Sequence, residues 1–412
     1  MPPSLASKIQ LVINALTYGG RSLGRYNGKA VFIPFTLPGE IVKAQITQEY
    51  KNHSVAKLVE VEKPSPQRVI PPCKYFAVCG GCHFQHLAYE DQLKTKQQIF
   101  EDTLSRIAKI KTPPVKAILS SPQQTGYRNN VQFHLDENGR LCFYPEDMES
   151  TLVPINKCLL APVSINEFID NLSFAPLSGI NKVSIRLGPD DLMLILEGEE
   201  GDIPELAVEA DISVVHVTDE DVVVISGNDS LHMQVLNKTF KVSPSSFFQV
   251  NSQAAEIMVD QVLGLIDWKS DHVVLDLYCG VGLFSSFLAP KVAKVIGVEV
   301  GYSSCSDYES NLDPYDNVEL YEGAAEDILP HLEERVDVII VDPPRAGLDK
   351  RVIEAIIRLS PASLIYVSCD PTTLARDLLR FSELGYGLIS AQPLDMFPQT
   401  FHIESINLLQ KL

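Results

Sequence analysis

The spacing of apolar residues along the chain changes twice, and each change marks a different kind of structure. Over residues 1–62, short runs such as KIQLVINAL and GKAVFIP alternate apolar with polar positions and are separated by Gly, Pro and Asn. This period of two predicts strands with one buried face. Four or five such strands in so short a stretch predict a small, OB-like β-barrel.

The Pro-rich stretch KPSPQRVIPP at 63–72 predicts a domain boundary, after which the pattern is mixed. Leu93, Phe100, Leu104 and Ile107 recur at helical spacing and predict an amphipathic helix over 87–110. Residues 125–240 contain several short strand-like runs separated by turn sequences such as DENG and GPDD. We therefore expect residues 63–240 to form a central α+β domain.

From residue 241 onward, strand-like runs alternate with helical segments. The runs HVVLDLYCG, AKVIGVEV, VDVIIVDPP and SLIYVSCD are apolar at consecutive positions. Strands of a parallel sheet are buried on both faces and have this pattern. Residues 241–412 are therefore expected to form an α/β, Rossmann-like domain, with ligands at the carboxyl ends of its strands.

Charge is distributed unevenly along the chain. The net charge of the whole chain is −19. Residues 1–120 nevertheless contain 16 basic and 8 acidic residues, whereas residues 121–412 contain 18 basic and 45 acidic residues. Such asymmetry is typical of proteins in which one part binds a polyanion such as a nucleic acid. A basic surface exposed only to solvent explains the charge equally well at this point.

The beginning of the chain lacks the pattern of a signal peptide, and no apolar run is long enough to span a bilayer. We therefore expect a cytoplasmic protein without a membrane partner. The chain contains eight cysteines. In a reducing compartment they are expected to be core residues, metal ligands or nucleophiles rather than disulfides.

Three cysteines lie within ten residues of one another, at Cys73, Cys79 and Cys82. This density in a cytosolic protein predicts a metal or iron–sulfur site. Cys158 or Cys142 would supply a fourth ligand, and zinc and an iron–sulfur cluster both accept four thiolates. The spacing differs from C-x3-C-x2-C, which argues against a radical enzyme.

The stretch VVLDLYCGVG predicts a strand followed by a glycine turn, with Gly280 and Gly282 allowing a nucleotide-like ligand to approach the backbone. A second strand ends at Glu299, which is well placed to accept hydrogen bonds from ribose hydroxyls. Because the G-x-G-x-x-G fingerprint of dehydrogenases is absent, the turn is more similar to the S-adenosylmethionine loop of methyltransferases. Asp342-Pro343-Pro344, at another strand end, resembles the signature of methyltransferases that act on bases.

Cys369 lies where the apolar strand LIYVS ends and a helix begins at Asp370-Pro371. The local field of a helix N-terminus favours the thiolate form of cysteine. Cys369 is therefore a candidate nucleophile, although most buried cysteines are only packing residues.

Six motifs occur together and in order: the Cys73–His86 cluster, SPSSFFQVN, DLYCGVG, VDPPRAGL, YVSCDPTTLARDL and FPQTFHIESI. Together they closely resemble the RNA uracil-5-methyltransferases that begin with a TRAM domain and modify ribosomal or transfer RNA. The resemblance implies a TRAM β-barrel, a central domain holding a [4Fe–4S] cluster and a methyltransferase domain. It also implies that the helix over 87–110 packs against the catalytic domain.

Carried over to this chain, the resemblance makes Cys369 the nucleophile that adds to uracil C6 and Glu404 the base that removes the C5 proton. It implies contacts with S-adenosylmethionine from Gln249, Tyr278, Gly280, Glu299, Glu326 and Asp342. The cluster ligands would be Cys73, Cys79, Cys82 and Cys158.

Two positions depart from the family pattern. Gln399 stands where many members have His, and Leu283 where several have Asn. These departures bear on the RNA subclass and on fine contacts with the cofactor, not on the chemistry. The expected substrate is a uridine of 23S ribosomal RNA, with the T-loop of transfer RNA as the alternative and with no obligate protein partner. A non-catalytic iron–sulfur protein that binds RNA is a more distant alternative.

Overall fold

The computed structural model describes residues 8–148, 151–172, 179–198, 212–218 and 221–412. The chain divides into two compact units. The first unit contains Met1–Asp102, Phe143–Val153 and Phe397–His402. The second unit contains Thr103–Cys142, Pro154–Met396 and Ile403–Leu412. The three domain ranges predicted from the sequence stay a prediction.

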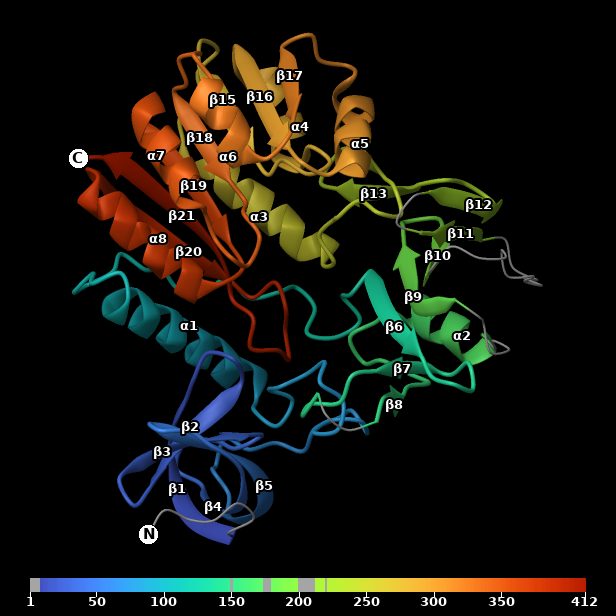
Figure 1. Cartoon of the computed structure of the whole chain (residues 1–412), viewed down its shortest axis with the longest axis vertical. Helices are drawn as coiled ribbons and strands as arrows, with labels where there is room; N and C mark the ends of the chain where they lie inside the picture. Colours follow the sequence, from blue (N-terminus) through green and yellow to red (C-terminus); the bar gives the residue numbers. More distant parts are fainter. Residues whose placement is uncertain (1–7, 149–150, 173–178, 199–211, 219–220) are drawn as a thin grey trace. The chain divides into compact units, whose positions relative to one another are not determined.

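The first unit contains a closed five-stranded barrel with strand order β1-β2-β3-β5-β4 (Figure 1). Its strands are β1 (Lys8–Leu16), β2 (Arg21–Tyr26), β3 (Lys29–Pro34), β4 (Ile41–Glu49) and β5 (His53–Lys63). Along β1 every second side chain, Ile9, Leu11 and Ile13, is buried in the barrel core. The period of two read from the sequence thus produces the predicted barrel, because alternate side chains of a strand face opposite sides.

A buried ion pair joins the barrel to the segment that follows it. The side chain of Glu40 is fully buried, and its carboxylate accepts hydrogen bonds from Nε and Nη2 of Arg68 at 2.5 and 2.7 Å. The backbone N–H groups of Leu37 and Ser65 also donate to this carboxylate. Burial alone would raise the pKa of Glu40, but the bonds from Arg68 and the two N–H groups outweigh it and lower the pKa.

The predicted helix is α1 (Tyr89–Arg106), which is shorter than the predicted range 87–110. Its buried polar side chains hold the segment Phe397–His402. Lys96 Nζ donates to the carbonyl of Phe397 at 3.0 Å, and Gln92 Nε2 donates to Oε1 of Gln399 at 2.9 Å. The predicted packing of this helix against the catalytic domain stays a prediction.

A seven-stranded sheet with order β12-β11-β10-β9-β6-β7-β8 forms the middle of the chain. Its elements are β6 (Asn130–Leu135), β7 (Leu141–Phe143), β8 (Val153–Pro154), β9 (Ile180–Leu187), β10 (Leu192–Gly198), β11 (Ser213–Val217) and β12 (Val222–Ser226), with helix α2 (Val163–Asn171). The pairs β6–β9 and β9–β10 are antiparallel, whereas β10 and β11 are parallel. The strand-rich pattern over 125–240 therefore corresponds to this mixed sheet and to the start of a separate two-stranded hairpin over residues 231–242.

The C-terminal part of the second unit is a seven-stranded sheet with order β17-β16-β15-β18-β19-β21-β20. Its strands are β15 (Val273–Leu277), β16 (Lys294–Glu299), β17 (Val318–Glu322), β18 (Val338–Val341), β19 (Ser363–Ser368), β20 (Tyr386–Leu394) and β21 (Glu404–Lys411). The first five strands are parallel, and β21 inserts antiparallel between β19 and β20. Every residue of β18 and β19 is buried, as the consecutive apolar runs predict.

Helices cover both faces of this sheet. They are α3 (Ser252–Leu265), α4 (Leu283–Leu288), α5 (Tyr302–Leu312), α6 (Ala325–Ile328), α7 (Lys350–Leu359) and α8 (Pro371–Glu383), and a hairpin of β13 (Leu231–Val235) and β14 (Lys238–Val242) precedes α3. Figure 1 shows α7 and α8 on one face and α3 on the other. Within the described ranges, no helix has the length and apolar character needed to cross a membrane.

The Glu40–Arg68 pair gives a testable prediction of stability. Replacing Glu40 by Gln leaves the Arg68 charge without its partner, so the free energy of unfolding should fall by about 3 kcal/mol. A lowered carboxyl pKa stabilises the fold above the ordinary value of 4.5, and this contribution is lost as the pH falls through the folded-state pKa. Urea titrations at several pH values should therefore show the difference between wild type and Glu40→Gln shrinking below pH 4.5. An unchanged difference at low pH contradicts the assignment.

Candidate active site

The pairing of β19 with β21 fixes the two residues expected to perform the chemistry. The antiparallel register runs from Ser363 opposite Gln410 to Ser368 opposite Ser405. Continued by one position, it sets Cys369 opposite Glu404, at the end where the parallel strands terminate. Glu404 is buried and also pairs with Leu394 of β20. The structure therefore brings these two predicted residues together.

The environment of Cys369 differs from the expectation of a thiolate-stabilising field. Asp370 caps α8 by accepting hydrogen bonds from the N–H groups of Thr372 and Thr373, so a carboxylate occupies the helix N-terminus. Burial and then the negative charge of Glu404 raise the pKa of the Cys369 thiol to about 12. Asp342 raises it further, and Arg345 acts in the opposite direction. Burial and these carboxylates therefore act against the thiolate form that the helix N-terminus was expected to favour, and the role of Cys369 stays a prediction.

Acidic groups form a row along the carboxyl ends of the strands. Burial, followed by the charge of Asp342, raises the pKa of Glu404 well above its usual value. Burial and the charge of Asp276 raise the pKa of Asp342 to about 7. Burial also raises the pKa of Asp276 to about 7, to which Glu299 contributes. A ligand carrying positive charge would stabilise the ionised forms of this row.

The glycine turn after β15 is held against the end of β16. Tyr278 has a φ of 61°, which is uncommon for a residue other than glycine. Gly282 has a φ of 89°, and a Cβ atom there would lie 2.4 Å from Leu312. The carboxylate of Glu299 accepts hydrogen bonds from the N–H groups of Gly280, Val300 and Gly301 at 3.0, 2.9 and 2.7 Å. Glu299 thus orders the turn that is expected to hold the cofactor.

Tyr278 and Glu326 lie on the same side of this turn. Burial raises the pKa of the Tyr278 hydroxyl, and the charge of Glu326 is the next contribution. Glu326, on α6, also forms an ion pair with Arg351 at 3.7 Å. Glu326 and Tyr278, two of the expected cofactor contacts, are therefore close enough to interact electrostatically.

Gln249 lies in the segment Ser243–Asn251, which joins β14 to α3. The backbone carbonyl of Gln249 accepts a hydrogen bond from Asn129 Nδ2 at 3.0 Å. Asn251 caps α3 by accepting from the N–H of Ala254, and its Nδ2 donates to the carbonyl of Met396 at 2.9 Å. The backbone on both sides of Gln249 is thus fixed.

The loop after Asp342 depends on a residue that was not singled out in the sequence. Asp377 is fully buried, and its Oδ2 accepts hydrogen bonds from the Leu348 N–H and the Tyr366 hydroxyl, both at 2.9 Å. The neighbouring Arg376 donates to the carbonyl of Ala346 at 2.9 Å. Arg376 and Asp377 both belong to the motif YVSCDPTTLARDL. The motif therefore drew attention to these residues, but it did not indicate which residues they would bind.

The two departures from the family pattern occupy buried positions. Gln399 has a φ of 69°, donates its N–H to Gln92 Oε1 at 3.1 Å, and accepts the N–H groups of His83 and Phe84 at its carbonyl. Leu283 is buried at the start of α4. Gln399 therefore has a defined role in the first unit, where it orders the segment that precedes Glu404 in the chain.

The described residues do not show the predicted iron–sulfur site. Cys79 Sγ accepts the N–H of Gly81 at 3.3 Å, while Cys142 Sγ donates to the carbonyl of Arg140 at the same distance. In the described parts of the chain, no group of three or more His, Cys, Asp or Glu side chains is arranged to hold a metal ion. The assignment of Cys73, Cys79, Cys82 and Cys158 as cluster ligands is thus not shown and stays a prediction.

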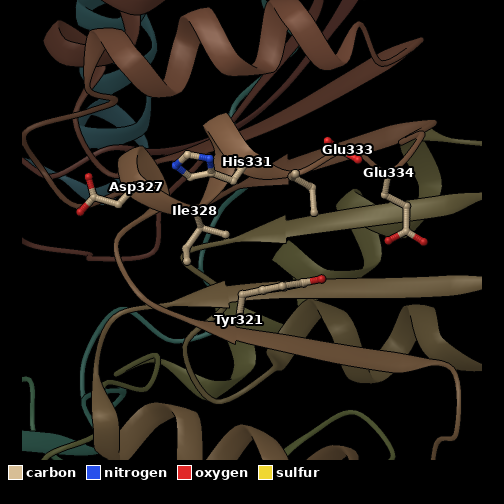
Figure 2. A pocket seen from close by; sticks show the side chains of 7 residues that line it. Tyr321, Asp327, Ile328, His331, Glu333 and Glu334 are labelled. Atoms are coloured by element: carbon tan, nitrogen blue, oxygen red, sulfur yellow. The ribbon is translucent and has the colours of Figure 1, made fainter.

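A cavity of about 530 Å³ lies beside β17 at the edge of the C-terminal sheet. It is lined by Tyr321, Asp327, Ile328, His331, Leu332, Glu333 and Glu334, most of which Figure 2 labels. None of the predicted site residues lines it. The candidate site consequently rests on the strand ends and not on this cavity.

The raised pKa of Cys369 predicts slow alkylation. At pH 8 the thiol should react with iodoacetamide much more slowly than N-acetylcysteine, because only the thiolate is nucleophilic. The rate should continue to increase toward pH 12. Replacing Glu404 by Gln removes a nearby negative charge and should increase the rate at pH 9, as measured by mass spectrometry of the peptide containing Cys369. A fast reaction at neutral pH in the wild type would disprove the assignment.

Known proteins match nearly the whole chain. This chain is 35% identical in sequence to an uncharacterized RNA methyltransferase of Aquifex aeolicus, over 98% of each chain. It is 32% identical to an uncharacterized RNA methyltransferase of Clostridium tetani, over 99% of this chain and 97% of the relative. The crystal structure of Pyrococcus abyssi tRNA (uracil-54, C5)-methyltransferase in complex with S-adenosyl-L-homocysteine matches with a TM-score of 0.77 and 25% identity. That match covers 97% of this chain and 100% of the other.

Two family models match separate parts of the chain. The TRAM domain matches residues 7–59, which coincide with the barrel. The tRNA (Uracil-5-)-methyltransferase family matches residues 209–412, which contain the row of acidic groups and Cys369. At the level of the family, the predictions of an RNA substrate and of S-adenosylmethionine as the methyl donor are confirmed. This chain is therefore a member of the RNA (uracil-5-)-methyltransferase family and an S-adenosylmethionine-dependent methyltransferase.

Proposed function

We propose that this enzyme methylates C5 of a uridine in RNA through a transient covalent bond between Cys369 Sγ and C6 of the uracil. The observation that carries the proposal is the register of β19 and β21, which sets Cys369 opposite Glu404 at the carboxyl ends of the parallel strands. A thiol, a buried carboxyl group and a cofactor turn at one edge of a sheet are the groups that this reaction requires.

Uracil C5 is a weak nucleophile until a group adds to C6. Addition of the Cys369 thiolate forms the Sγ–C6 bond and moves the electron pair of the C5–C6 double bond into an enolate. C5 would then take the methyl group of S-adenosylmethionine as the S–CH3 bond breaks, with neutral S-adenosylhomocysteine as the leaving group. Glu404 removes the remaining C5 proton, and the electrons of that C–H bond restore the double bond as the Sγ–C6 bond breaks. One difficult substitution is thereby divided into easier steps.

The charges of the site fit this sequence of proton transfers. A base acts best when its pKa lies near the working pH, and burial raises the pKa of Glu404 in that direction. The Cys369 thiol has to lose its proton before addition. Arg345 already lowers its pKa, and the positive charge of S-adenosylmethionine would lower it further.

The proposed contacts with S-adenosylmethionine come from Gln249, Tyr278, Gly280, Glu299, Glu326 and Asp342. They are supported by the glycine turn and by the carboxylate of Glu299, which retains acceptor capacity beside three N–H donors. Asp342 and Asp276 provide negative charge, which favours a cationic ligand.

For the RNA, we propose a uridine of 23S ribosomal RNA as the substrate and transfer RNA as the second candidate. The second candidate is favoured by the Pyrococcus abyssi structure, whose protein acts on uracil-54 of tRNA. Either RNA requires the target base to leave its stack, since C5 and C6 are covered in a helix. The basic residues of the N-terminal region would bind phosphates.

A [4Fe–4S] cluster on Cys73, Cys79, Cys82 and Cys158 stays a prediction, and no step of the reaction depends on it. It is supported by three thiols in one loop and by the N–H of Gly81 that donates to Cys79 Sγ. Protein purified without oxygen should contain iron and acid-labile sulfide, with both lost in Cys79→Ser and retained in Cys142→Ser. Wild-type protein that contains neither under these conditions excludes the cluster.

The covalent mechanism and the substrate can be tested in one experiment. Full-length protein is incubated with S-adenosylmethionine and transcripts of 23S ribosomal RNA or transfer RNA that contain 5-fluorouridine. Fluorine at C5 cannot be removed as a proton, so the adduct should persist on a denaturing gel with the true substrate. Cys369→Ala should form none, and Glu404→Gln should accumulate adduct on ordinary RNA because release is slowed.

The outcomes separate the two parts of the proposal. If the adduct forms with transfer RNA alone, transfer RNA replaces 23S ribosomal RNA as the proposed substrate. The proposed covalent mechanism is then unchanged. Methylation of RNA by Cys369→Ala at the wild-type rate overturns the covalent mechanism, whichever RNA is used. Cys142→Ala serves as the control, because Cys142 is also a buried cysteine but lies on β7 of the middle sheet, outside the cofactor turn.

A further inference from the structure

The segment Ser243–Asn251 is held from one side by an arginine that lies outside the methyltransferase sheet. Arg186, on β9 of the middle sheet, is only 6% exposed. Its Nη1 donates to the carbonyl of Ser243 at 2.9 Å, and its Nη2 donates to the carbonyls of Ser246 and Pro244 at 3.1 and 3.4 Å. One guanidinium group therefore fixes three carbonyls of a single turn, which its planar arrangement of donors allows.

An aspartate holds the same turn from the other side. Asp307, on α5, is fully buried. Its carboxylate accepts the N–H and hydroxyl of Ser243, both at 2.7 Å, and the hydroxyl of Ser246 at 2.6 Å. Arg186 thus binds the acceptors of the turn and Asp307 binds its donors.

The charges of the two residues suit this arrangement. Burial lowers the pKa of Arg186 to about 10, whereas the charge of Asp307 acts to raise it, so the guanidinium stays protonated at neutral pH. Charged hydrogen bonds in a buried site are stronger than neutral ones and impose a single geometry. The turn between them is consequently rigid.

The middle sheet also fixes the far end of the segment. Asn130 of β6 pairs with Arg186 of β9, and the adjacent Asn129 donates its Nδ2 to the carbonyl of Gln249 and to Ser252 Oγ. Two neighbouring strands of one sheet therefore contact both ends of the segment that carries Gln249.

We propose that Arg186 and Asp307 are positioning residues that hold the segment Ser243–Asn251 in the conformation in which Gln249 binds S-adenosylmethionine. The inference rests on the proposed role of Gln249 and adds that cofactor affinity depends on a residue of the middle sheet. Arg186 itself does not contact the cofactor in this scheme. Its contribution is to reduce the freedom of a ligand-binding segment before the ligand arrives.

The test measures binding of S-adenosyl-L-homocysteine by calorimetry with the full-length protein. Arg186→Met keeps an unbranched, flexible side chain but removes its charge and donors, and we expect its dissociation constant for S-adenosyl-L-homocysteine to rise about tenfold, as the loss of a charged hydrogen bond predicts. In RNA methylation, KM for S-adenosylmethionine should rise by a similar factor, while kcat changes less than about threefold. Arg186→Lys, which retains a charge and fewer donors, should restore part of the affinity.

Lys182→Met is the matched control. Lys182 also lies on β9 and also carries a positive charge, but its partner is Glu197 at 3.3 Å on the neighbouring strand. It has no hydrogen bond to the segment Ser243–Asn251 among the contacts of the described residues. Its dissociation constant for S-adenosyl-L-homocysteine should equal that of the wild type.

Milder changes in the bonds between the turn and Asp307 provide a second test if Arg186→Met fails to fold. Ser246→Ala removes one hydroxyl and its bond to Asp307, and Asp307→Asn replaces the carboxylate acceptor. Both should raise the dissociation constant by severalfold without changing the far-ultraviolet circular dichroism spectrum. Wild-type affinity in a folded Arg186→Met variant overturns the proposal, and so does an affinity loss in Lys182→Met equal to that in Arg186→Met.

Gln249→Ala separates this inference from the function on which it rests. If Gln249→Ala binds S-adenosyl-L-homocysteine as tightly as the wild type, the proposed role of Gln249 is wrong, and the positioning inference falls with it. If Gln249→Ala weakens binding and Arg186→Met does not, only the positioning inference is wrong. The double variant should lose little more affinity than the worse single variant, because both changes act on the same contact.

Discussion

The candidate site depends on one constraint, the antiparallel insertion of β21 between β19 and β20. A strand that runs against its neighbours begins where they end, so Glu404 at the start of β21 falls beside Cys369 at the end of β19. A slip of one residue would turn every side chain of β21 to the opposite face. Asn407 on β21, whose Nδ2 donates to the carbonyl of Tyr366 on β19 at 2.9 Å, favours the observed register over such a slip.

The same edge of the sheet concentrates negative charge that the protein alone does not balance. Glu299, Asp276, Asp342 and Glu404 influence one another in succession, and burial raises the pKa of the last three. Burial and neighbouring charges thus favour the protonated thiol and the neutral carboxyl groups. A cationic methyl donor changes that balance in the direction the proposed reaction needs, so binding and activation of the thiol are physically linked.

Positions around the site are fixed by buried ion pairs and hydrogen bonds from distant parts of the chain. Asp377 holds the loop after Asp342, and Arg186 with Asp307 holds the segment that carries Gln249. Each of these charged residues is buried only because its partners satisfy it, and removing one partner leaves an uncompensated group. The loop after Asp342 and the segment that carries Gln249 are therefore held in place by the protein itself.

By itself, the sequence determined the elements of the fold and the identity of the candidate groups. Alternation along residues 8–16 and consecutive apolar runs such as VDVIIV produce a barrel and a parallel sheet, because burial on one or both faces is a local property of a strand. Motif order placed the chain in its family, and the residues of the glycine turn were sufficient to locate that turn.

Only the tertiary structure decided the environment of these groups. A helix N-terminus next to Cys369 predicted a stabilised thiolate, but burial in the fold, followed by the charges of Glu404 and Asp342, raises the pKa of this thiol. The roles of Arg186, Asp307 and Asp377 depend on partners elsewhere in the chain that no local pattern of residues specifies. Burial patterns act over a few residues, whereas electrostatics and hydrogen bonding depend on which distant residues the fold brings together.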